Sequence, residues 1–361
     1  PQPAAFPLED LEAACRLVLQ GQGDVALQYG GPQGYSGLRE VLAQRIGQQE
    51  GMELGPGNFM LTGGAAQALA NICFTFLDPG DVVVTENPTF TGSLRTIRAH
   101  QPHVVGVPLD GEGPCLDALA LALDEAQRQG RRAKIIYLTP NFQNPTGITF
   151  SLARRQAIVA LAARYRCLIA EDDAYGELRY DGQRLPSLFT LAGGQGVVRL
   201  GTFSKTIGPG LRLGWSLASQ EVIQALVAMR LDMGTSPLTA RLVAAYAADG
   251  RYHRHVEELI PFYRPKRDAM MAALERHCGS WAHWRVPEGG FFVWLELPAE
   301  ADGDAVAAAA LEEGVMVVPG ASFFCQDPQC NYLRLSYSFI ASDDVDEAVR
   351  RLACAAASLL V

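Results

Sequence analysis

One lysine stands among small residues in the stretch GTFSKTIGPGLRLGW, residues 201–215, and an arginine follows it seven positions later. Lys205 directly follows the apolar run VVRLGTF, so we expect it where a strand ends and the chain turns. Arg212 supplies a planar guanidinium that suits a phosphate. A lysine partly withdrawn from water beside a fixed cation has a lowered pKa and becomes a usable amine nucleophile. The pair therefore indicates imine chemistry beside a phosphate, with a solvated surface lysine as the alternative.

A second place for a phosphate lies earlier in the chain, in LTGGAAQALANICF. Gly63 and Gly64 end the apolar run NFMLT, and a helix-forming stretch begins at about Ala65. The first N–H groups of a helix have no partner inside it, and together with the helix dipole they attract an anion. The amides of Ala65 and Ala66 are therefore candidate phosphate ligands, although an ordinary strand-to-helix turn shows the same pattern.

Polar and aromatic side chains follow other apolar runs. Asn144, in NPTG, comes after AKIIYL, and three acids at 171–173 come directly after CLIA. At least one of these acids is expected to point inward, and a buried carboxylate needs a partner. Asp172 would suit a protonated ring nitrogen, and Tyr175 could reach the same ligand. Phe90, in ENPTFTG, could stack on a flat ring; turn and core roles are the alternatives for these residues.

The elements that carry these residues alternate along the first two thirds of the chain. Strand-like runs are NFMLT, DVVVTE, HVVGVPL, AKIIYLT, RCLIAED, VVRLGTF and RLGWSLA, and helical stretches such as LARRQAIVALAARYR lie between them. Near-continuous Val, Ile and Leu suits strands covered on both faces, so we predict an α/β fold with a mostly parallel sheet flanked by helices. Ligands of such sheets bind at the carboxyl ends of the strands.

The last third of the chain predicts a smaller α+β domain. A long helical stretch at 252–277 contains Pro261 and Pro265, which are expected to bend or divide it. After it come GGFFVWLEL, the helical DAVAAAALEEG, VMVVPG and YLRLSYSF. We predict a large domain at 27–257 and a small domain formed by 1–26 and 258–361, with the helical stretch at 8–20 packed against the latter.

Composition excludes several classes of partner. The chain has 361 residues and a formal net charge of -9, which argues against general affinity for nucleic acid or for an anionic membrane. No apolar run approaches the roughly 20 residues that span a bilayer. Eight cysteines are scattered, without a CxxC pair, as is typical of free thiols in a reducing compartment. We therefore expect a cytoplasmic protein without a metal site.

In their order and spacing, these segments resemble the class I/II aminotransferases, which are fold-type I pyridoxal-phosphate enzymes. The resemblance runs from LQYGGPQGYSGLREVLA near the start to NYLRLSYSF near the end. Its most specific part is the ordered set NPTG, EDDAY, TFSKTIGPGLRLG and YLRLS. The branch that contains the 2-aminoadipate and kynurenine aminotransferases looks most similar.

The resemblance implies a role for each residue around the cofactor ring. Lys205 would form the imine link to pyridoxal 5'-phosphate and move the proton between the substrate Cα and the cofactor. Asp172 would pair with the pyridine N–H, which keeps the ring able to accept electrons. Asn144 and Tyr175 would hydrogen-bond the phenolic oxygen of the cofactor, and Phe90 would stack on its ring.

The resemblance also implies the remaining contacts. The phosphate would be held by Arg212, Thr202, Ser204 and the amides of Ala65 and Ala66. Arg334, in YLRLS, with Asn144 beside it, would bind the α-carboxylate of the substrate as a bidentate pair. Tyr29, in LQYGG, would reach the phosphate of the other subunit, which implies a homodimer with shared active sites.

Two departures from the family pattern are visible. Relatives often carry Ser-Gln where this chain has Ala65 and Ala66, so side-chain bonds to the phosphate are lost and we expect weaker retention of the cofactor. The family usually has an N-terminal arm with a Gly-x-Pro segment over the substrate. Because the sequence begins at PQPAAFPLEDL, we expect either that the sequence is truncated or that the substrate site is more open.

The resulting prediction is a ping-pong aminotransferase acting on an L-amino acid and a 2-oxo acid. A carbon–sulfur lyase or a decarboxylase could use the same cofactor link, although Arg334 favours reactions that keep the α-carboxylate. A ligand-sensing, non-catalytic domain of a transcription regulator is another alternative, because GYSGLRE is shared with that group. The acidic balance offers no DNA-binding surface for that role.

Overall fold

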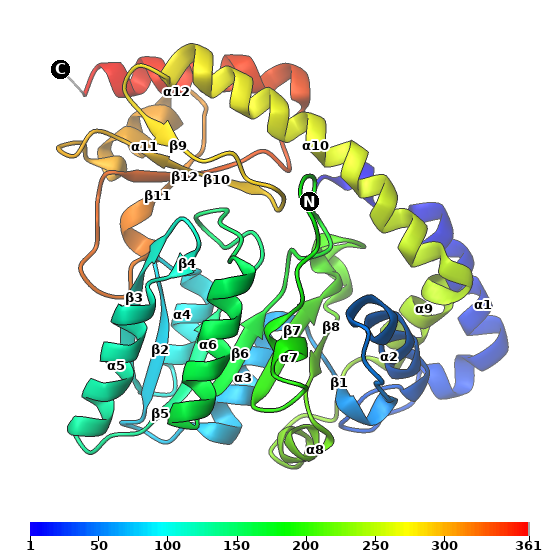
Figure 1. Cartoon of the computed structure of the whole chain (residues 1–361). Coiled ribbons are helices and arrows are strands. Elements are labelled where there is room, and N and C mark those ends of the chain that lie inside the picture. The colour runs from blue at the N-terminus through cyan, green and yellow to red at the C-terminus, as the bar shows by residue number, and fades with distance from the viewer. Residues whose placement is uncertain (360–361) are drawn as a thin grey trace.

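An eight-stranded sheet forms the centre of the larger part of the molecule in the computed structural model, which describes residues 1–359 (Figure 1). The strand order is β1-β8-β7-β6-β5-β2-β3-β4. β7, β6, β5, β2 and β3 run parallel, β8 is antiparallel to both its neighbours, and β4 is antiparallel to β3. The strands are β1 (Phe59–Thr62), β2 (Val82–Asn87), β3 (His103–Asp110), β4 (Gly113–Pro114), β5 (Ala133–Leu138), β6 (Leu168–Asp172), β7 (Val197–Thr202) and β8 (Gly214–Leu217). The predicted mostly parallel sheet is confirmed.

Alternate residues of these strands belong to two separate cores, one on each face of the sheet. Val82 and Val84 of β2 point to the face covered by α5 and α6, whereas Val83 points to the face covered by α3, α4 and α8. This explains the near-continuous apolar runs, because both faces of a strand are covered. The helices of this part are α2 (Ser36–Glu50), α3 (Ala65–Phe76), α4 (Thr91–Arg98), α5 (Leu116–Arg128), α6 (Leu152–Tyr165), α7 (Leu188–Leu191), α8 (Gln220–Ala228) and α9 (Pro237–Ala247).

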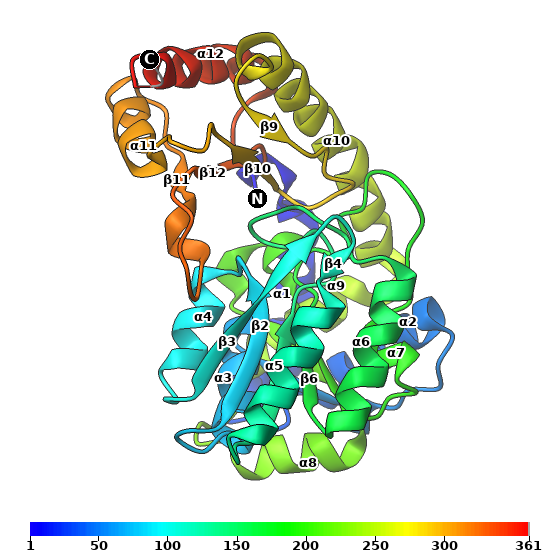
Figure 2. The same cartoon turned by 60° about the vertical axis from the view of Figure 1, so that its left-hand side comes forward.

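A second, four-stranded antiparallel sheet lies above the carboxyl ends of the large sheet (Figure 2). Its strand order is β11-β12-β10-β9, with Trp294 of β10 opposite Arg334 of β12. Its core is separate from the two large cores and contains Leu295, Leu333 and Leu352. The elements are α10 (Arg251–Cys278), β9 (His283–Trp284), β10 (Phe292–Glu296), α11 (Gly303–Glu312), β11 (Val318–Pro319), β12 (Tyr332–Ser336) and α12 (Val345–Ala357). The predicted smaller α+β part is confirmed.

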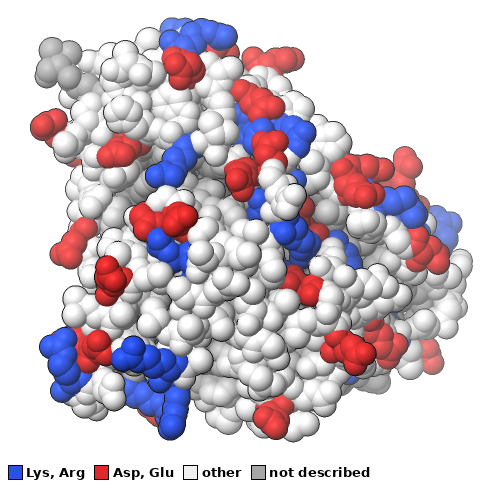
Figure 3. Space-filling model, in the orientation of Figure 1, with Lys and Arg blue, Asp and Glu red and all other residues white. Residues whose placement is uncertain are grey.

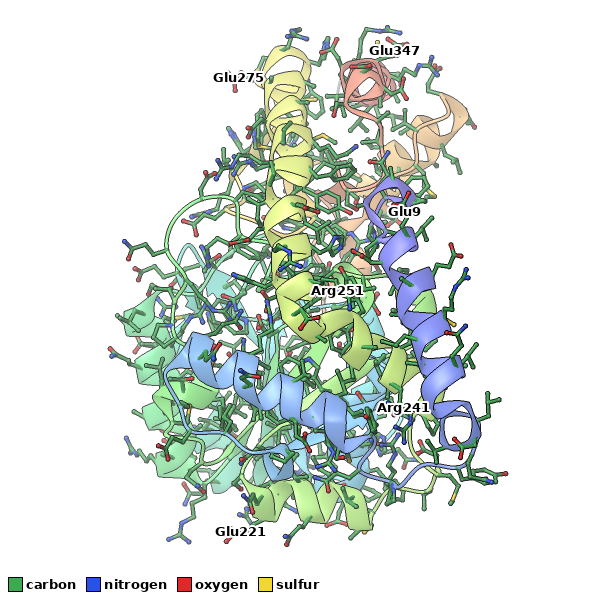
Figure 4. All side chains as sticks on the ribbon, turned by 90° about the vertical axis from the view of Figure 1, so that its right-hand side faces the viewer. Glu9, Glu221, Arg241, Arg251, Glu275 and Glu347 are labelled. Carbon is green, nitrogen blue, oxygen red and sulfur yellow. The ribbon has the colours of Figure 1, made fainter. Side chains whose placement is uncertain are left out.

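The longest helix connects the two parts. Figure 4 shows α10 running from Arg251 beside the large sheet to Glu275 beside the small one. Pro261 and Pro265, which were expected to bend or divide it, do not divide it. Both prolines lie on the exposed face, four residues apart, where water can satisfy the carbonyls that lose their helical donors.

The first helix, α1 (Leu8–Ala26), packs differently from the expectation. Ala14 belongs to the core of the large sheet, and Gln22 accepts a hydrogen bond from Arg241 of α9 at 2.5 Å. The residues before α1 contact the smaller part: Ala5 packs on its core, and the Gln2 amide donates to the Tyr263 hydroxyl at 3.2 Å. The apolar face of α1 therefore follows α9 and not the small sheet.

The surface carries mixed charge. On the face drawn in Figure 3, basic and acidic side chains are interspersed over a largely uncharged area. Across residues 1–359, none of the helices is long and apolar enough to cross a membrane.

Candidate active site

The chain has three lysines, and two of them are engaged away from the carboxyl edge of the sheet. Lys134 lies 3.2 Å from Asp81, and Lys266 donates to a backbone carbonyl near the end of β12. Lys205 ends a short 3-10 turn, η3 (Phe203–Lys205), that follows β7 directly. Its Nζ atom lies 5.6 Å from the centre of the Tyr175 ring. The sequence-based placement of this lysine at a strand end is thus what the structure shows.

The surroundings of Lys205 favour its neutral amine. Burial is the main cause of a lowered pKa, and the positive charges of Arg334 and Arg212 lower this pKa further. The carboxylate of Asp172 acts in the opposite direction. An amine with a lowered pKa is a nucleophile and a proton acceptor nearer to neutral pH than an ordinary lysine.

The three acids at the end of β6 point to three different partners. Glu171 accepts the backbone N–H groups of Leu188 and Phe189 at 2.9 and 3.0 Å. Asp173 pairs with Arg199 at 2.6 Å, on the far side of the same strand end. Both therefore have structural partners, which leaves Asp172 as the acid available to a ligand.

One oxygen of Asp172 is left without a partner. Its Oδ2 accepts a hydrogen bond from the Tyr137 hydroxyl at 2.7 Å, whereas its buried Oδ1 has no hydrogen-bond partner within residues 1–359. Burial raises the pKa of Asp172 to about 6, against the lowering effects of Tyr137 and Lys205. A buried carboxylate oxygen without a donor is costly, so it indicates a ligand with an N–H group at this place.

Asn144, Tyr175 and Arg334 form a contiguous group above this strand edge. The Asn144 Oδ1 accepts a hydrogen bond from Arg334 Nη1 at 3.0 Å. Burial raises the pKa of the Tyr175 hydroxyl, and the nearby Asn144 side chain acts to lower it. The guanidinium of Arg334 lies over the rings of Phe292 and Phe323, 4.3 and 5.0 Å from their centres. The group therefore brings together three residues predicted from separate motifs.

Arg334 keeps donors free for a second ligand. Its Nε is buried and has no partner within the described residues 1–359. Burial lowers the pKa of Arg334, and the nearby Tyr175 raises it. A guanidinium held against two aromatic rings, with an N–H group left unused, is suited to a carboxylate bound through two parallel hydrogen bonds.

The predicted phosphate ligands meet at the start of α3. Gly64 has a positive φ of 99°, and a Cβ placed on it would lie 3.6 Å from Arg212 Nη2 and 3.8 Å from Thr202 Oγ1. The Thr202 and Ser204 hydroxyls lie 2.9 Å apart. No side chain caps α3, whose first residues are Ala65 and Ala66. The free N–H groups at this helix end are therefore available to an anion.

Two predicted site residues lie outside this buried group. Phe90 precedes α4 and is 37% exposed, so its ring has a free face. Tyr29 is 80% exposed and lines a surface hollow of about 440 Å³ together with Leu27 and Met233. Within residues 1–359, Tyr29 makes no hydrogen bond to Lys205 or to the residues around it.

Some residues of the site were missed by sequence reasoning. Tyr137, within the apolar run AKIIYL, has the pattern of a core residue, but its hydroxyl donates a hydrogen bond to Asp172. Glu86 of β2 is fully buried and accepts hydrogen bonds from Thr139 N and Gln143 Nε2, each at 3.0 Å. The signal was present, since a buried Tyr hydroxyl or Glu carboxylate requires a partner.

The residues present fit pyridoxal phosphate. The partnerless Asp172 Oδ1 matches a protonated ring nitrogen, the uncapped start of α3 and Arg212 match a phosphate, and Lys205 matches an aldehyde. Among residues 1–359, no group of three or more His, Cys, Asp or Glu side chains is arranged to hold a metal ion.

Comparison with known proteins agrees with this arrangement. The pattern of the family "Aminotransferase class I and II" matches residues 5–352. The aromatic-amino-acid aminotransferase 1 of Thermococcus litoralis is 36% identical, over 98% of this chain and 85% of that protein. The 2-aminoadipate transaminase of Thermus thermophilus is 38% identical, over 100% of this chain and 89% of that protein.

A solved structure shows the same fold. LysN of Thermus thermophilus, an alpha-aminoadipate aminotransferase complexed with N-(5'-phosphopyridoxyl)-L-leucine, superposes with a TM-score of 0.92 and 38% identity. The match covers 100% of this chain and 91% of that chain. The chain therefore belongs to the class I and II aminotransferases and is a pyridoxal-phosphate-dependent aminotransferase with the fold-type I architecture.

Proposed function

We propose that this aminotransferase moves an amino group between an L-amino acid and a 2-oxo acid in two successive half-reactions at the carboxyl edge of the large sheet. The observation that carries the proposal is a pair of buried atoms with unused hydrogen-bonding capacity, Asp172 Oδ1 and Arg334 Nε. Asn144 accepts a hydrogen bond from Arg334 and acts to lower the pKa of Tyr175, so it lies close to both residues. One of the two buried atoms suits a ring nitrogen and the other suits a carboxylate.

The residues that would hold the cofactor come from the groups described above and from Phe90, just before α4. Asp172 would accept the ring N–H, Asn144 and Tyr175 would bond its phenolic oxygen, and Phe90 would cover one face of the ring. Arg212, Thr202, Ser204 and the amides of Ala65 and Ala66 would hold the phosphate. When bound, the protonated ring supplies an electron sink for the bond electrons at the substrate Cα.

Lys205 supplies the proton chemistry. Its lowered pKa makes its Nζ available as the base that takes the proton from the substrate Cα. In the second half-reaction, the same amine would return a proton to the Cα of the new amino acid. Arg334 fixes the α-carboxylate and so orients the Cα–H bond toward Lys205.

A panel of amino donors tests this function. Amino acids are mixed singly with the holoenzyme, and the cofactor absorbance is followed before any 2-oxo acid is added. The donors named for the relatives, aromatic amino acids and 2-aminoadipate, are the first to test. Conversion to the amino form of the cofactor without release of ammonia supports the proposal; release of ammonia and pyruvate would indicate a lyase, and no conversion with any donor would indicate a sensor.

We also propose a homodimer in which Tyr29 reaches the phosphate of the partner subunit. Its support is the strong exposure of Tyr29 beside Leu27 and Met233, which are 72% and 62% exposed. Large exposed apolar side chains that line one hollow are typical of an interface.

Hybrid dimers test the sharing of sites. Mixtures of Tyr29→Ala and Lys205→Ala subunits form hybrids in which an intact Lys205 meets an intact Tyr29 from the other chain. Activity above the sum of the two parents supports shared sites. Activity no higher than that sum in proven hybrids would contradict them.

Two further assignments complete the proposal. We place the protein in the cytoplasm, with support from its eight free cysteines, three of them buried. We keep 27–257 as the large domain and 258–361 as the body of the small domain, and we assign α1 by its packing on α9 to the large one.

A further inference from the structure

A tyrosine hydroxyl lies between α4 and β6, next to the acid proposed to bind the ring nitrogen of the cofactor. Tyr137 is fully buried on β5, and its hydroxyl lies 2.7 Å from both Ser93 Oγ and Asp172 Oδ2. Ser93 is in the first turn of α4, the helix that Phe90 precedes. The hydroxyl thus links β6, which carries Asp172, to α4, which Phe90 precedes.

The hydroxyl has one proton for two acceptors, which gives the contact a direction. A carboxylate is a stronger acceptor than a serine hydroxyl, so Tyr137 donates to Asp172 when that acid is ionised. Ser93 can then donate its own proton to the Tyr137 oxygen. The result is a chain of donors, Ser93 to Tyr137 to Asp172, that ends on the charged form of the acid.

Charges around Asp172 make such a donor important. Glu86 faces Asp172 from β2 and Asp173 directly follows it in the chain, and both carboxylates oppose a second negative charge. Lys205, on η3, favours the charge from the other side. Tyr137 is the side-chain donor on Asp172, and it engages Oδ2 only, so Oδ1 is left for a ligand.

We propose that Tyr137, supported by Ser93, is a positioning residue that keeps Asp172 ionised and turned so that Oδ1 faces the ring nitrogen of the cofactor. This inference rests on the proposed role of Asp172. It predicts that the hydroxyl of Tyr137 contributes to holding a protonated ring, although it touches neither the cofactor nor the substrate.

The test compares Tyr137→Phe with the wild type in apoenzyme titrated with pyridoxal phosphate. The hydrogen bond is present before the cofactor binds, so only its strengthening beside a protonated ring is lost, and we expect binding weaker by up to roughly tenfold. The ring-nitrogen NMR signal of ¹⁵N-labelled cofactor should move toward the unprotonated position, and its titration midpoint should fall to lower pH. Ser93→Ala should shift the same signal in the same direction by a smaller amount.

Tyr246→Phe is the matched control. Tyr246 is also fully buried, but its hydroxyl has no hydrogen-bond partner in the described chain and lies on α9. Its removal should leave the affinity and the nitrogen signal unchanged. Equal effects of the two substitutions would mean a merely structural role and would overturn the proposal.

Asp172→Asn distinguishes a failure of the proposed role of Asp172 from a failure of the proposed role of Tyr137. If this variant binds the cofactor with wild-type affinity and an unchanged nitrogen signal, the proposed role of Asp172 fails and the inference fails with it. If Asp172→Asn shifts the signal but a correctly folded Tyr137→Phe does not, only the role of Tyr137 is overturned.

Discussion

The two ends of the proposed cofactor site are built in different ways. At the ring end, Asp172, Asn144, Tyr175 and Tyr137 are all buried, Tyr137 donates to Asp172, and Asn144 accepts from Arg334. At the phosphate end, Arg212 and Ala66 are exposed, and the donors are a helix terminus and hydroxyls that contact one another. The ring end is therefore a preorganised environment for one charge, whereas the phosphate end is a set of accessible donors.

This difference indicates that the ring end controls protonation and the phosphate end retains the cofactor. Groups that set the protonation state of a reacting ring act only when water is excluded and their positions are fixed. Groups that retain a doubly charged phosphate act well at a wet surface, because helix amides and a guanidinium remain strong donors there. Substitutions at the ring end should thus change rates and pKa values, and substitutions at the phosphate end should change retention.

The largest effect is expected at Lys205. Lys205→Ala removes both the attachment point and the proton carrier, so turnover should fall by roughly 10³-fold or more, since general acid–base catalysis alone contributes about 10²–10⁴. Steady-state assays with cofactor in excess and the absorbance band of lysine-bound cofactor measure this. Lys134→Ala is the control and should keep both; normal turnover of the Lys205 variant would overturn the mechanism.

The next effect concerns the substrate and not the cofactor. Arg334→Ala should lower kcat/KM by roughly 10²- to 10³-fold, because truncating a buried charged partner costs about 2–5 kcal/mol. Cofactor affinity, measured by titration, should stay within a few-fold of the wild type. Arg334→Lys should recover little, since an ammonium cannot form the bidentate pair. If cofactor affinity fell by as much as kcat/KM, Arg334 would not serve the substrate alone.

The ring end should destabilise the cofactor-free fold. The pKa of Asp172 in the folded chain is about 6, above its ordinary 3.8, so folding favours its protonated form. The stability of the wild type relative to Asp172→Asn therefore falls as pH rises from about 4 to about 6 and stays low above that. The apo variant should be more stable than the wild type by up to about 3 kcal/mol at pH 8. Denaturant unfolding at pH 8 and pH 4 measures this, and a variant less stable at pH 8 would contradict it.

Arg212 tests the phosphate end. Arg212→Ala should weaken cofactor binding by roughly 10- to 100-fold, because hydrogen bonds to charged groups contribute about 1.5–3 kcal/mol. Saturating cofactor should restore kcat to near the wild-type value. Dialysis followed by titration measures retention, and kcat that stays low at saturation would contradict the division between the two ends.

The smallest effect is expected at the start of α3. Ala65→Ser adds one hydroxyl donor at the position where relatives carry serine, and a neutral hydrogen bond contributes about 0.5–1.5 kcal/mol. The cofactor should be retained roughly 2- to 10-fold better during dialysis, with kcat unchanged. Ala68→Ser, one turn later on the buried face, is the matched control. No gain in retention would mean that backbone donors already satisfy the phosphate.

The sequence predicted the sheet and the residues at its carboxyl edge better than it predicted long-range contacts. Apolar runs with turn residues after them predicted the parallel sheet and placed Lys205, Asp172 and Asn144 at its carboxyl edge, because strand ends are readable from local pattern. The sequence predicted the helical stretch at 252–277 but not that it stays undivided at Pro261, because local propensity does not show which face of the helix is exposed.

The hydrogen-bond network was also beyond the local pattern. Tyr137 and Asp172 are 35 residues apart, and their contact depends on the pairing of β5 with β6. The position of Ser93 next to Tyr137 depends in addition on how α4 packs on the sheet. Such long-range contacts follow from the three-dimensional arrangement, so the sequence indicated that a buried acid needs a partner but not which residue it is.

The most direct test of the central claim is chemical trapping of the cofactor link. The holoenzyme is reduced with borohydride, digested, and its peptides are analysed by mass spectrometry. Because the chain has only three lysines, 134, 205 and 266, the modified position is unambiguous. The phosphopyridoxyl group is predicted on Lys205 alone, in stoichiometric yield; its presence on Lys134 or Lys266, or its absence from a cofactor-loaded and active enzyme, would contradict the account.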